Sequence, residues 1–214
     1  MIKENDMKQW ISLILSAVLL AGCSAQVPEP KEEEPAEIIE MKGSEPGGQK
    51  YEATIKVKDY GDIVFEMDEG IAPETVQNFV KLANEGFYDG LTFHRLIEGF
   101  MAQGGDPNGD GTGGAEEDIQ GEFLSNGFNN SLKHIRGTVS MARSGDPDSA
   151  SSQFFIVQED TPSLDGEYAA FGTVTSGMDV VDKILEDARP TDDNGTISKD
   201  RQPVIESITV TKEE

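Results

Sequence analysis

An abrupt change of composition near residue 50 limits how much of this chain can fold. Between Ser24 and Lys50 prolines alternate with glutamates, and almost nothing apolar is available to bury. Such a sequence cannot offset the entropy lost on ordering, so we expect residues 23–50 to form a disordered, charge-extended tether. A spacer is the simplest role for it, and a partner-binding tail is the alternative. The folded domain should therefore be residues 51–214, which are enough for a sizeable core.

Hydrophobic periodicity predicts a β-rich domain with two helices. Residues 51–58 alternate apolar and polar side chains, as a half-buried strand does, and residues 63–67 are expected to return beside them. Pro73 suits the first turn of a helix, and apolar residues follow it at helical spacing up to a plausible stop at Gly86. A second amphipathic helix is predicted near residues 178–185. Further strands are predicted over residues 137–142, 153–157, 170–174 and 204–210.

The first 22 residues have the pattern of a targeting segment. A short apolar run over residues 10–21 follows a polar start, and it is well below the ~20 residues that span a bilayer. The run ends in Leu20-Ala21-Gly22-Cys23, which resembles the lipobox of bacterial lipoproteins. That resemblance implies a signal peptide over residues 1–22 and a diacylglyceryl group on Cys23, the new N-terminus after cleavage. An ordinary signal peptide followed by a chance cysteine is the alternative.

Charge and residue inventory exclude several classes of function. The formal net charge of −24 repels phosphate backbones, so we expect no nucleic-acid partner. The chain has a single cysteine, so it forms no intramolecular disulfide. Two histidines, His94 and His134, are too few for a typical zinc cluster, and the acidic run at residues 116–118 lacks the alternating ligands of an EF-hand. We therefore expect no metal and no cofactor.

The stretch FHRLIEGFMAQGGD, Phe93–Asp106, sets one cation close to large apolar side chains. If it were extended throughout, Arg95, Met101 and Gln103 would point to the same side, because alternate residues of a strand share a face. A guanidinium and an amide would then lie beside an apolar surface. Two further stretches are suited to complete this site: SMARSGDPDSASSQFFIV, residues 140–157, and SLDGEYAAFGTV, residues 163–174.

Together the three stretches resemble the cyclophilin family of peptidyl-prolyl cis-trans isomerases, and the resemblance extends over residues 51–214. It implies a mainly β fold, namely a closed eight-stranded antiparallel β-barrel capped by two α-helices. It also implies that Arg95 is the catalytic guanidinium and that Gln103 positions it and touches the substrate. The substrate-binding residues that it implies are Phe100, Met101, Ala142, Arg143, Phe155, Leu164 and Tyr168.

Three positions depart from the family pattern. Arg143 stands where many relatives have asparagine, and we expect it to be tolerated because the contact there is made by the backbone. Ser163 replaces a tryptophan that contacts cyclosporin in the best-known eukaryotic members, which argues against tight cyclosporin binding. Tyr168 replaces a histidine at the pocket rim and still offers a flat, amphipathic wall. We interpret His94 as structural and His134 as a loop residue, since the mechanism has no use for a base.

Isomerisation of an X-Pro bond needs no nucleophile and no proton transfer. Its barrier is about 18–20 kcal/mol, and twisting the bond returns a lone pair to the prolyl nitrogen, where a guanidinium can bind it. We expect a membrane-anchored monomer outside the cytoplasm, on the outer face of the cytoplasmic membrane or on an outer membrane. Its partners would be proline-containing polypeptides, above all unfolded exported proteins. The alternative is a module that holds proline loops without turnover, although ring binding alone would need neither Arg95 nor Gln103.

Overall fold

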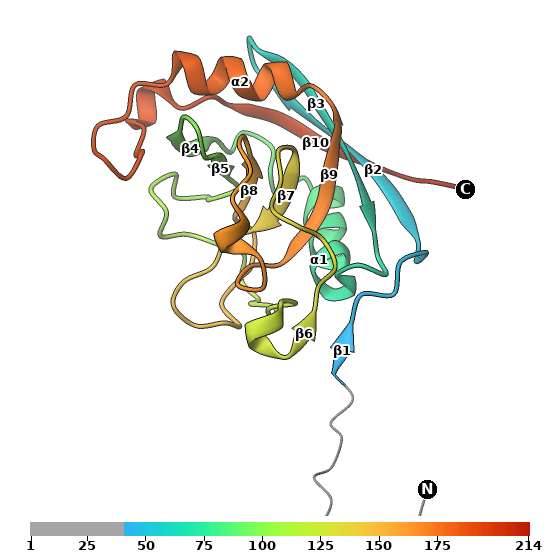
Figure 1. Cartoon of the computed structure of the whole chain (residues 1–214). Coiled ribbons are helices and arrows are strands. Elements are labelled where there is room, and N and C mark those ends of the chain that lie inside the picture. Colours follow the sequence, from blue (N-terminus) through green and yellow to red (C-terminus); the bar gives the residue numbers. More distant parts are fainter. Residues whose placement is uncertain (1–40) are drawn as a thin grey trace, which may run out of the picture. The chain divides into compact units, whose positions relative to one another are not determined.

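The computed structural model describes residues 41–214; the predicted signal peptide, Cys23 and the predicted tether up to residue 40 lie outside the described residues. Eight strands form one strongly curled antiparallel sheet in the order β10-β2-β3-β9-β7-β8-β5-β4 (Figure 1). Their bounds are β2 Lys50–Val57, β3 Gly61–Asp68, β4 Phe93–Ile97, β5 Met101–Gly104, β7 Thr138–Met141, β8 Phe154–Val157, β9 Ala170–Ser176 and β10 Ile205–Lys212. The predicted mainly β class is confirmed.

The two edge strands of this sheet, β4 and β10, are not paired along their length. In the described part of the chain, the residues just before these strands, Thr92 and Val204, form an isolated bridge with each other. A backbone hydrogen bond from Ile205 N to Leu91 O, 2.8 Å long, lies beside that bridge. The sheet is thus a curled half-barrel, and the full closure that we expected is not shown by its strand pairing.

The two predicted helices are present as α1, Pro73–Asn84, and α2, Met178–Asp187. Helix α1 begins at the proline, whose missing N–H costs nothing in a first turn. Its N-terminal amides at Glu74 and Thr75 donate to the carboxylate of Glu122, at 3.0 and 2.8 Å, so an acid from a distant loop caps the helix. Each helix buries one apolar face against the rest of the domain. Three short 3-10 turns, Leu124–Asn126, Pro162–Leu164 and Lys199–Arg201, lie in the connecting loops.

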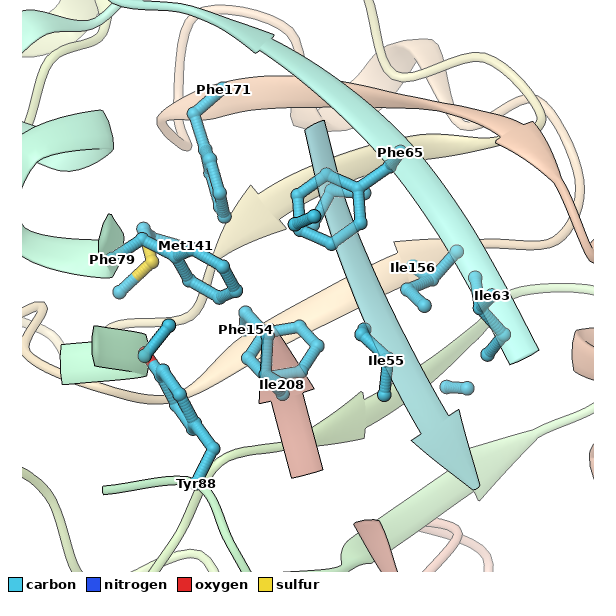
Figure 2. Packing of buried hydrophobic residues seen from close by; sticks show 14 of the residues in the cluster. Ile55, Ile63, Phe65, Phe79, Tyr88, Met141, Phe154, Ile156, Phe171 and Ile208 are labelled. Atoms are coloured by element: carbon cyan, nitrogen blue, oxygen red, sulfur yellow. The ribbon is translucent and has the colours of Figure 1, made fainter. Parts of the chain in front are cut away.

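The main core fills the concave side of the sheet and is rich in aromatic rings (Figure 2). Phe79 of α1 lies at its centre, with ring centroids 5.1 Å from Tyr88, 5.6 Å from Phe154 and 5.5 Å from Phe65. Offset and edge-to-face pairs of this kind add to the free energy gained by burial. This core fixes the inner face of the strands whose outer face carries the site.

Alternation along β8 separates that core from a second, smaller cluster. Phe154 and Ile156 belong to the main core, whereas Phe155 and Val157 pack with Met101 of β5 on the opposite face. Successive side chains of a strand point to opposite faces, so neighbouring residues serve different parts of the molecule. The second cluster is the apolar half of the candidate site.

Residues 42–49 contradict the predicted tether boundary at residue 50. Strand β1, Lys42–Gly43, pairs in parallel with β6, Phe128–Asn129. The carboxylate of Asp68 then accepts hydrogen bonds from the amides of Gly47 and Gly48, at 2.7 and 2.8 Å. Residues 42–49 make these contacts with their backbone groups. Amino-acid composition gives no information about backbone contacts, so the tether was predicted to extend too far, to residue 50. None of the helices in residues 41–214 has the length and apolar character that a bilayer crossing requires.

Candidate active site

The stretch that carries Arg95 is a hairpin and not one continuous extended segment. The chain turns between β4 and β5, where Phe100 N donates to Ile97 O over 3.1 Å. In the hairpin Arg95 pairs with Gln103, and Ile97 pairs with Met101. Directly opposed residues of two strands share a face, so the cation and the amide do lie on one side. Arg95 and Gln103 therefore do point to the same side, as predicted. The cause is their pairing across the hairpin, and not alternation along one extended segment.

A chain of hydrogen bonds fixes the guanidinium of Arg95. Its Nε donates to the carbonyl oxygen of Asn194 over 2.8 Å, and its Nη1 donates to Oε1 of Gln103 over 3.1 Å. The amide nitrogen of Gln103 donates in turn to Oε1 of Gln153 over 2.9 Å, and Gln153 donates to Gly113 O over 2.7 Å. Two of the three guanidinium nitrogens are therefore held in place. Within residues 41–214 no acceptor binds the third, Nη2.

The environment of Arg95 strengthens its interactions without removing its charge. Partial burial lowers the pKa of the guanidinium, and the neighbouring Tyr168 and Asp192 oppose that shift. A guanidinium still stays protonated at any ordinary pH. A cation that is partly withdrawn from water interacts more strongly with a nearby dipole or lone pair than an exposed one does.

Beside this cation lies a cavity of about 460 Å³ with an apolar floor. All nine residues predicted for the active site line it: Arg95, Phe100, Met101, Gln103, Ala142, Arg143, Phe155, Leu164 and Tyr168. Met101 and Phe155 are almost fully buried, whereas the others are partly exposed. The structure thus brings the whole predicted set together, while the individual roles stay predictions.

Phe155, on the cavity floor, is supported by two rings. His134 stacks on it with centroids 6.0 Å apart and planes 17° apart, and Tyr168 meets it edge-on at 5.9 Å. His134 is buried, with Nδ1 3.1 Å from a carboxylate oxygen of Asp165 and Nε2 3.0 Å from Oγ of Ser140. His134 does lie in a loop, as we expected, but its buried ring also supports the pocket floor, a role that the sequence did not indicate.

Burial and hydrogen bonding shift both groups of the His134–Asp165 pair. Burial lowers the pKa of His134, and the hydrogen bond to Asp165 only partly opposes this. Burial alone would raise the pKa of Asp165, but the hydrogen bonds from the backbone and the ring of His134 lower it overall. Above neutral pH the pair is thus a neutral imidazole bound to an ionised carboxylate.

Asp106 holds the glycine-rich loop that forms one rim of the cavity. Its carboxylate accepts hydrogen bonds from the amides of Asn108, Asp110 and Gly111, at 2.7, 3.0 and 2.6 Å. Although burial raises it, these bonds lower the pKa of Asp106 overall. The glycine-rich stretch was recognised from the sequence, but the acid that shapes it was not. A GD pair before a glycine-rich loop is the signal that could have indicated it.

Three further residues, two that line the cavity and one behind it, were missed or only partly understood from the sequence. Gln153 was noted as part of a matching stretch, and its link to Gln103 follows from the pairing of β5 with β8. Asn194 binds Arg95 through a backbone carbonyl, which no residue pattern reveals. His94 lines the cavity, is buried, and has no partner for either ring nitrogen among residues 41–214. Burial lowers the pKa of His94, so the ring is neutral at neutral pH.

Over residues 41–214, no three histidine, cysteine or acidic side chains lie close enough to hold a metal ion. The cavity itself offers the fixed guanidinium of Arg95, the amide of Gln103 and an apolar floor. Such a set can bind a hydrophobic ring while placing a positive charge against an atom at the ring edge.

Comparison with known proteins gives a consistent result. A family model described as cyclophilin type peptidyl-prolyl cis-trans isomerase matches residues 53–210. A peptidyl-prolyl cis-trans isomerase of Helicobacter pylori is 48% identical over 155 residues, which cover 72% of this chain and 91% of that relative. Peptidyl-prolyl cis-trans isomerase B of Bacillus subtilis is 51% identical over 123 residues, or 58% of this chain and 82% of that one.

A solved structure agrees with these relatives. The crystal structure of a cyclophilin-type isomerase of Cryptosporidium parvum, determined in the presence of the dipeptide Ala-Pro, has a TM-score of 0.66 and 32% identity to this chain. It covers 76% of this chain and 99% of its own. The similarity therefore extends over nearly the whole of the solved relative.

Proposed function

This chain belongs to the cyclophilin family and is a peptidyl-prolyl cis-trans isomerase; from that premise we propose that it is anchored to a membrane and speeds the folding of exported proteins. The observation that carries the catalytic part is the guanidinium of Arg95, fixed by two acceptors beside an apolar cavity. The lipobox at residues 20–23 and the acidic segment after it support the anchored part.

In the proposed mechanism the prolyl ring occupies the floor made by Met101, Phe155 and Leu164. Burial of the ring binds both planar isomers and the twisted form alike, so by itself it does not accelerate rotation. The guanidinium of Arg95 faces the prolyl nitrogen, which regains its lone pair only when the amide twists. Gln103 holds Arg95 and offers its amide to the peptide backbone. The positive charge is therefore most useful in the transition state.

The residues of this site can account for the rate acceleration that an isomerase needs. An acceleration of ~10⁵-fold requires roughly 7 kcal/mol of stabilisation of the twisted form relative to the planar forms. Removal of a single preorganised donor from such a site typically costs about 2.7–4 kcal/mol. Arg95 would supply a large share, and backbone hydrogen bonds with fixed peptide geometry would supply the rest.

The anchor is proposed on chemical grounds. One acyl chain holds a protein on a bilayer only marginally, whereas the diacylglyceryl group expected on Cys23 supplies two chains and stable attachment. The acidic segment after Cys23 would keep the domain away from the lipid surface. Because residues 42–49 pack on the domain, the spacer would be shorter than composition suggests, ending near residue 41.

The anchored part can be tested with the native protein. Mass spectrometry of membrane-extracted protein should show a mature N-terminus at Cys23 that carries a diacylglyceryl group. Cys23→Ala should leave an uncleaved or mislocalised precursor, while isomerase activity on a short Ala-Pro peptide stays unchanged. An unmodified Cys23, or a mature start elsewhere, would refute the anchor and leave the isomerase activity untouched.

The alternative function, a module that holds proline loops without turnover, shares the cavity but does not need Arg95 in a fixed position. It would be favoured if the loss of Arg95 left both the isomerisation rate and the biological role unchanged. The folding of an exported client with a slow proline-limited phase, measured with and without the enzyme, decides between the two roles.

A further inference from the structure

The side chain of Arg143 is built into the pocket wall. Its guanidinium lies between two aromatic rings, with the central carbon 5.0 Å from the centroid of Phe123 and 4.8 Å from that of Tyr168. The side chain is 14% exposed. From the sequence we expected only the backbone of this residue to matter. Two of the three departures from the family pattern, Arg143 and Tyr168, are thus in direct contact.

Hydrogen bonds fix the orientation of this guanidinium between the rings. Nε donates to the carbonyl oxygen of Glu167 over 3.0 Å, and Nη1 donates to the carbonyl oxygen of Ser144 over 2.9 Å. Nη2 lies 3.6 Å from a carboxylate oxygen of Glu167. The planar fork of an arginine can satisfy these acceptors while both of its faces stay on aromatic rings, which a lysine cannot do.

The two rings differ in how firmly the fold holds them. Phe123 is 1% exposed and belongs to the main core. Tyr168 is partly exposed, lines the cavity, and meets Phe155 edge-on at 5.9 Å. Arg143 therefore links a buried core ring to the ring that forms the rim of the proline pocket. Arg143 also links two loops: its backbone belongs to the loop at residues 142–144, and its Nε donates to the carbonyl oxygen of Glu167 in the other loop.

We propose that Arg143 is a positioning residue for substrate binding, whose guanidinium holds Tyr168 against Phe155 and so fixes the rim of the proline pocket. The inference rests on the isomerase activity and assigns to this side chain a role besides the backbone contact expected of its position. Because the rim contacts planar and twisted prolyl bonds alike, its loss weakens binding uniformly. A loss of binding that is equal in the ground state and the transition state raises KM and leaves kcat unchanged.

The test uses the full chain and Arg143→Met, which keeps an unbranched apolar stem and removes the charged fork. Peptide affinity is measured by titration, and the rate by exchange spectroscopy on peptides that contain one Ala-Pro, Glu-Pro or Lys-Pro bond. We expect Kd and KM to rise about 5- to 30-fold, the scale of one or two partly desolvated cation–π contacts, with kcat within about 3-fold. The rise should be the same for all three peptides.

Three comparisons make this result specific to positioning. In a Tyr168→Ala background, Arg143→Met should change Kd by less than about 2-fold, since the group that it positions is gone. Arg143→Lys should lie between the parent and Arg143→Met, because it keeps the charge and loses the fork. Arg136→Met removes a partly exposed arginine that pairs with Asp182 away from the cavity, and it should leave Kd and KM unchanged.

Several outcomes would overturn the proposal. An unchanged Kd, or an equal loss with and without Tyr168, would show that Arg143 does not act through that ring. A larger loss for Glu-Pro than for Lys-Pro peptides would show a direct charge contact with the substrate. If Arg143→Met failed to fold, Arg143→Lys would decide the question, because parental affinity in that variant would show that the fork is not needed.

Discussion

The cavity has two walls that are built on different principles. One wall is polar: Arg95 and Gln103 line the cavity, and with Gln153 behind them they form a directional series of hydrogen bonds that ends on backbone carbonyls. The other is apolar: Phe155 and its neighbours are held by stacking and burial. A hydrogen bond fails when one donor moves by a fraction of an ångström, whereas buried area declines gradually. Damage to the polar wall should therefore reduce the rate, and damage to the apolar wall should reduce affinity.

The largest effect should come from Arg95→Ala, which removes the cation of the polar wall. We expect kcat to fall about 10²–10³-fold, the scale for one preorganised electrostatic donor, while peptide affinity changes little. The fold should survive, since the pocket floor does not include the guanidinium. Exchange spectroscopy gives the rate and titration gives the affinity. Arg136→Ala is the matched control and should behave as the parent. Equal rates for Arg95→Ala and the parent would disprove the mechanism.

Next in size is Phe155→Ala, which removes the floor of the apolar wall. Burying a phenylalanine side chain is worth about 1.5–3 kcal/mol, so peptide affinity should weaken by roughly 10- to 100-fold. The same variant leaves a void beneath His134 and should lower the melting temperature. Phe155→Leu, which refills part of the void, should recover most of both losses. If affinity were retained and only kcat fell, the two walls would not differ as described.

A smaller and more specific effect is expected for Gln153→Ala. Gln153 does not contact Arg95, but it accepts a hydrogen bond from Gln103, which in turn holds the guanidinium. Loss of one such bond is worth about 0.5–1.5 kcal/mol, so kcat should fall roughly 2- to 12-fold with affinity nearly unchanged. Gln49→Ala, at a position away from the cavity, should have no effect on either quantity. A parental rate in Gln153→Ala would show that Gln103 needs no support.

For both walls the sequence indicated the residues that line the cavity but not the contacts that hold them in place. Periodicity located six of the eight strands of the sheet and both helices, because alternation and helical spacing follow directly from which side chains are buried. It did not separate β4 from β5, whose hairpin was expected only as one extended segment. The apolar wall and Arg95 followed from resemblance. The support of each wall did not: Asn194 acts through its backbone, His134 through a stacking position set by a distant strand, and Arg143 through two rings from separate loops. Such contacts depend on tertiary placement, which no local pattern encodes.

The same limit of local sequence patterns explains why residues 42–49 were assigned to the tether. Burial of apolar side chains leaves a mark in composition, and this segment has none. It is held by a short parallel pairing with β6 and by the carboxylate of Asp68. A segment that is attached through backbone amides looks, in sequence, like one that is not attached at all.

The smallest predicted effect concerns pH and the support of the apolar wall by His134. Burial lowers the pKa of this imidazole below its value in the unfolded chain, about 6.5. The unfolded state therefore binds a proton more readily, and the associated stability is present above pH 6.5 and is lost as pH falls through the folded pKa. Asp165, whose pKa is also lowered, adds a further loss only below about pH 3.8.

The melting temperature of the parent should accordingly be lower at pH 5.5 than at pH 7.5, and His134→Gln should show a smaller difference, because a glutamine does not titrate. His94 contributes in the same direction, since burial lowers its pKa as well, so the double variant His94→Gln/His134→Gln should show the smallest difference. The rate on an Ala-Pro peptide should change less with pH than the stability does, because the polar wall depends on Arg95, which stays charged throughout. If the parent and the double variant lost stability equally between the two pH values, folding would not lower the pKa of either imidazole. The support of the apolar wall would then have to be assigned to packing alone.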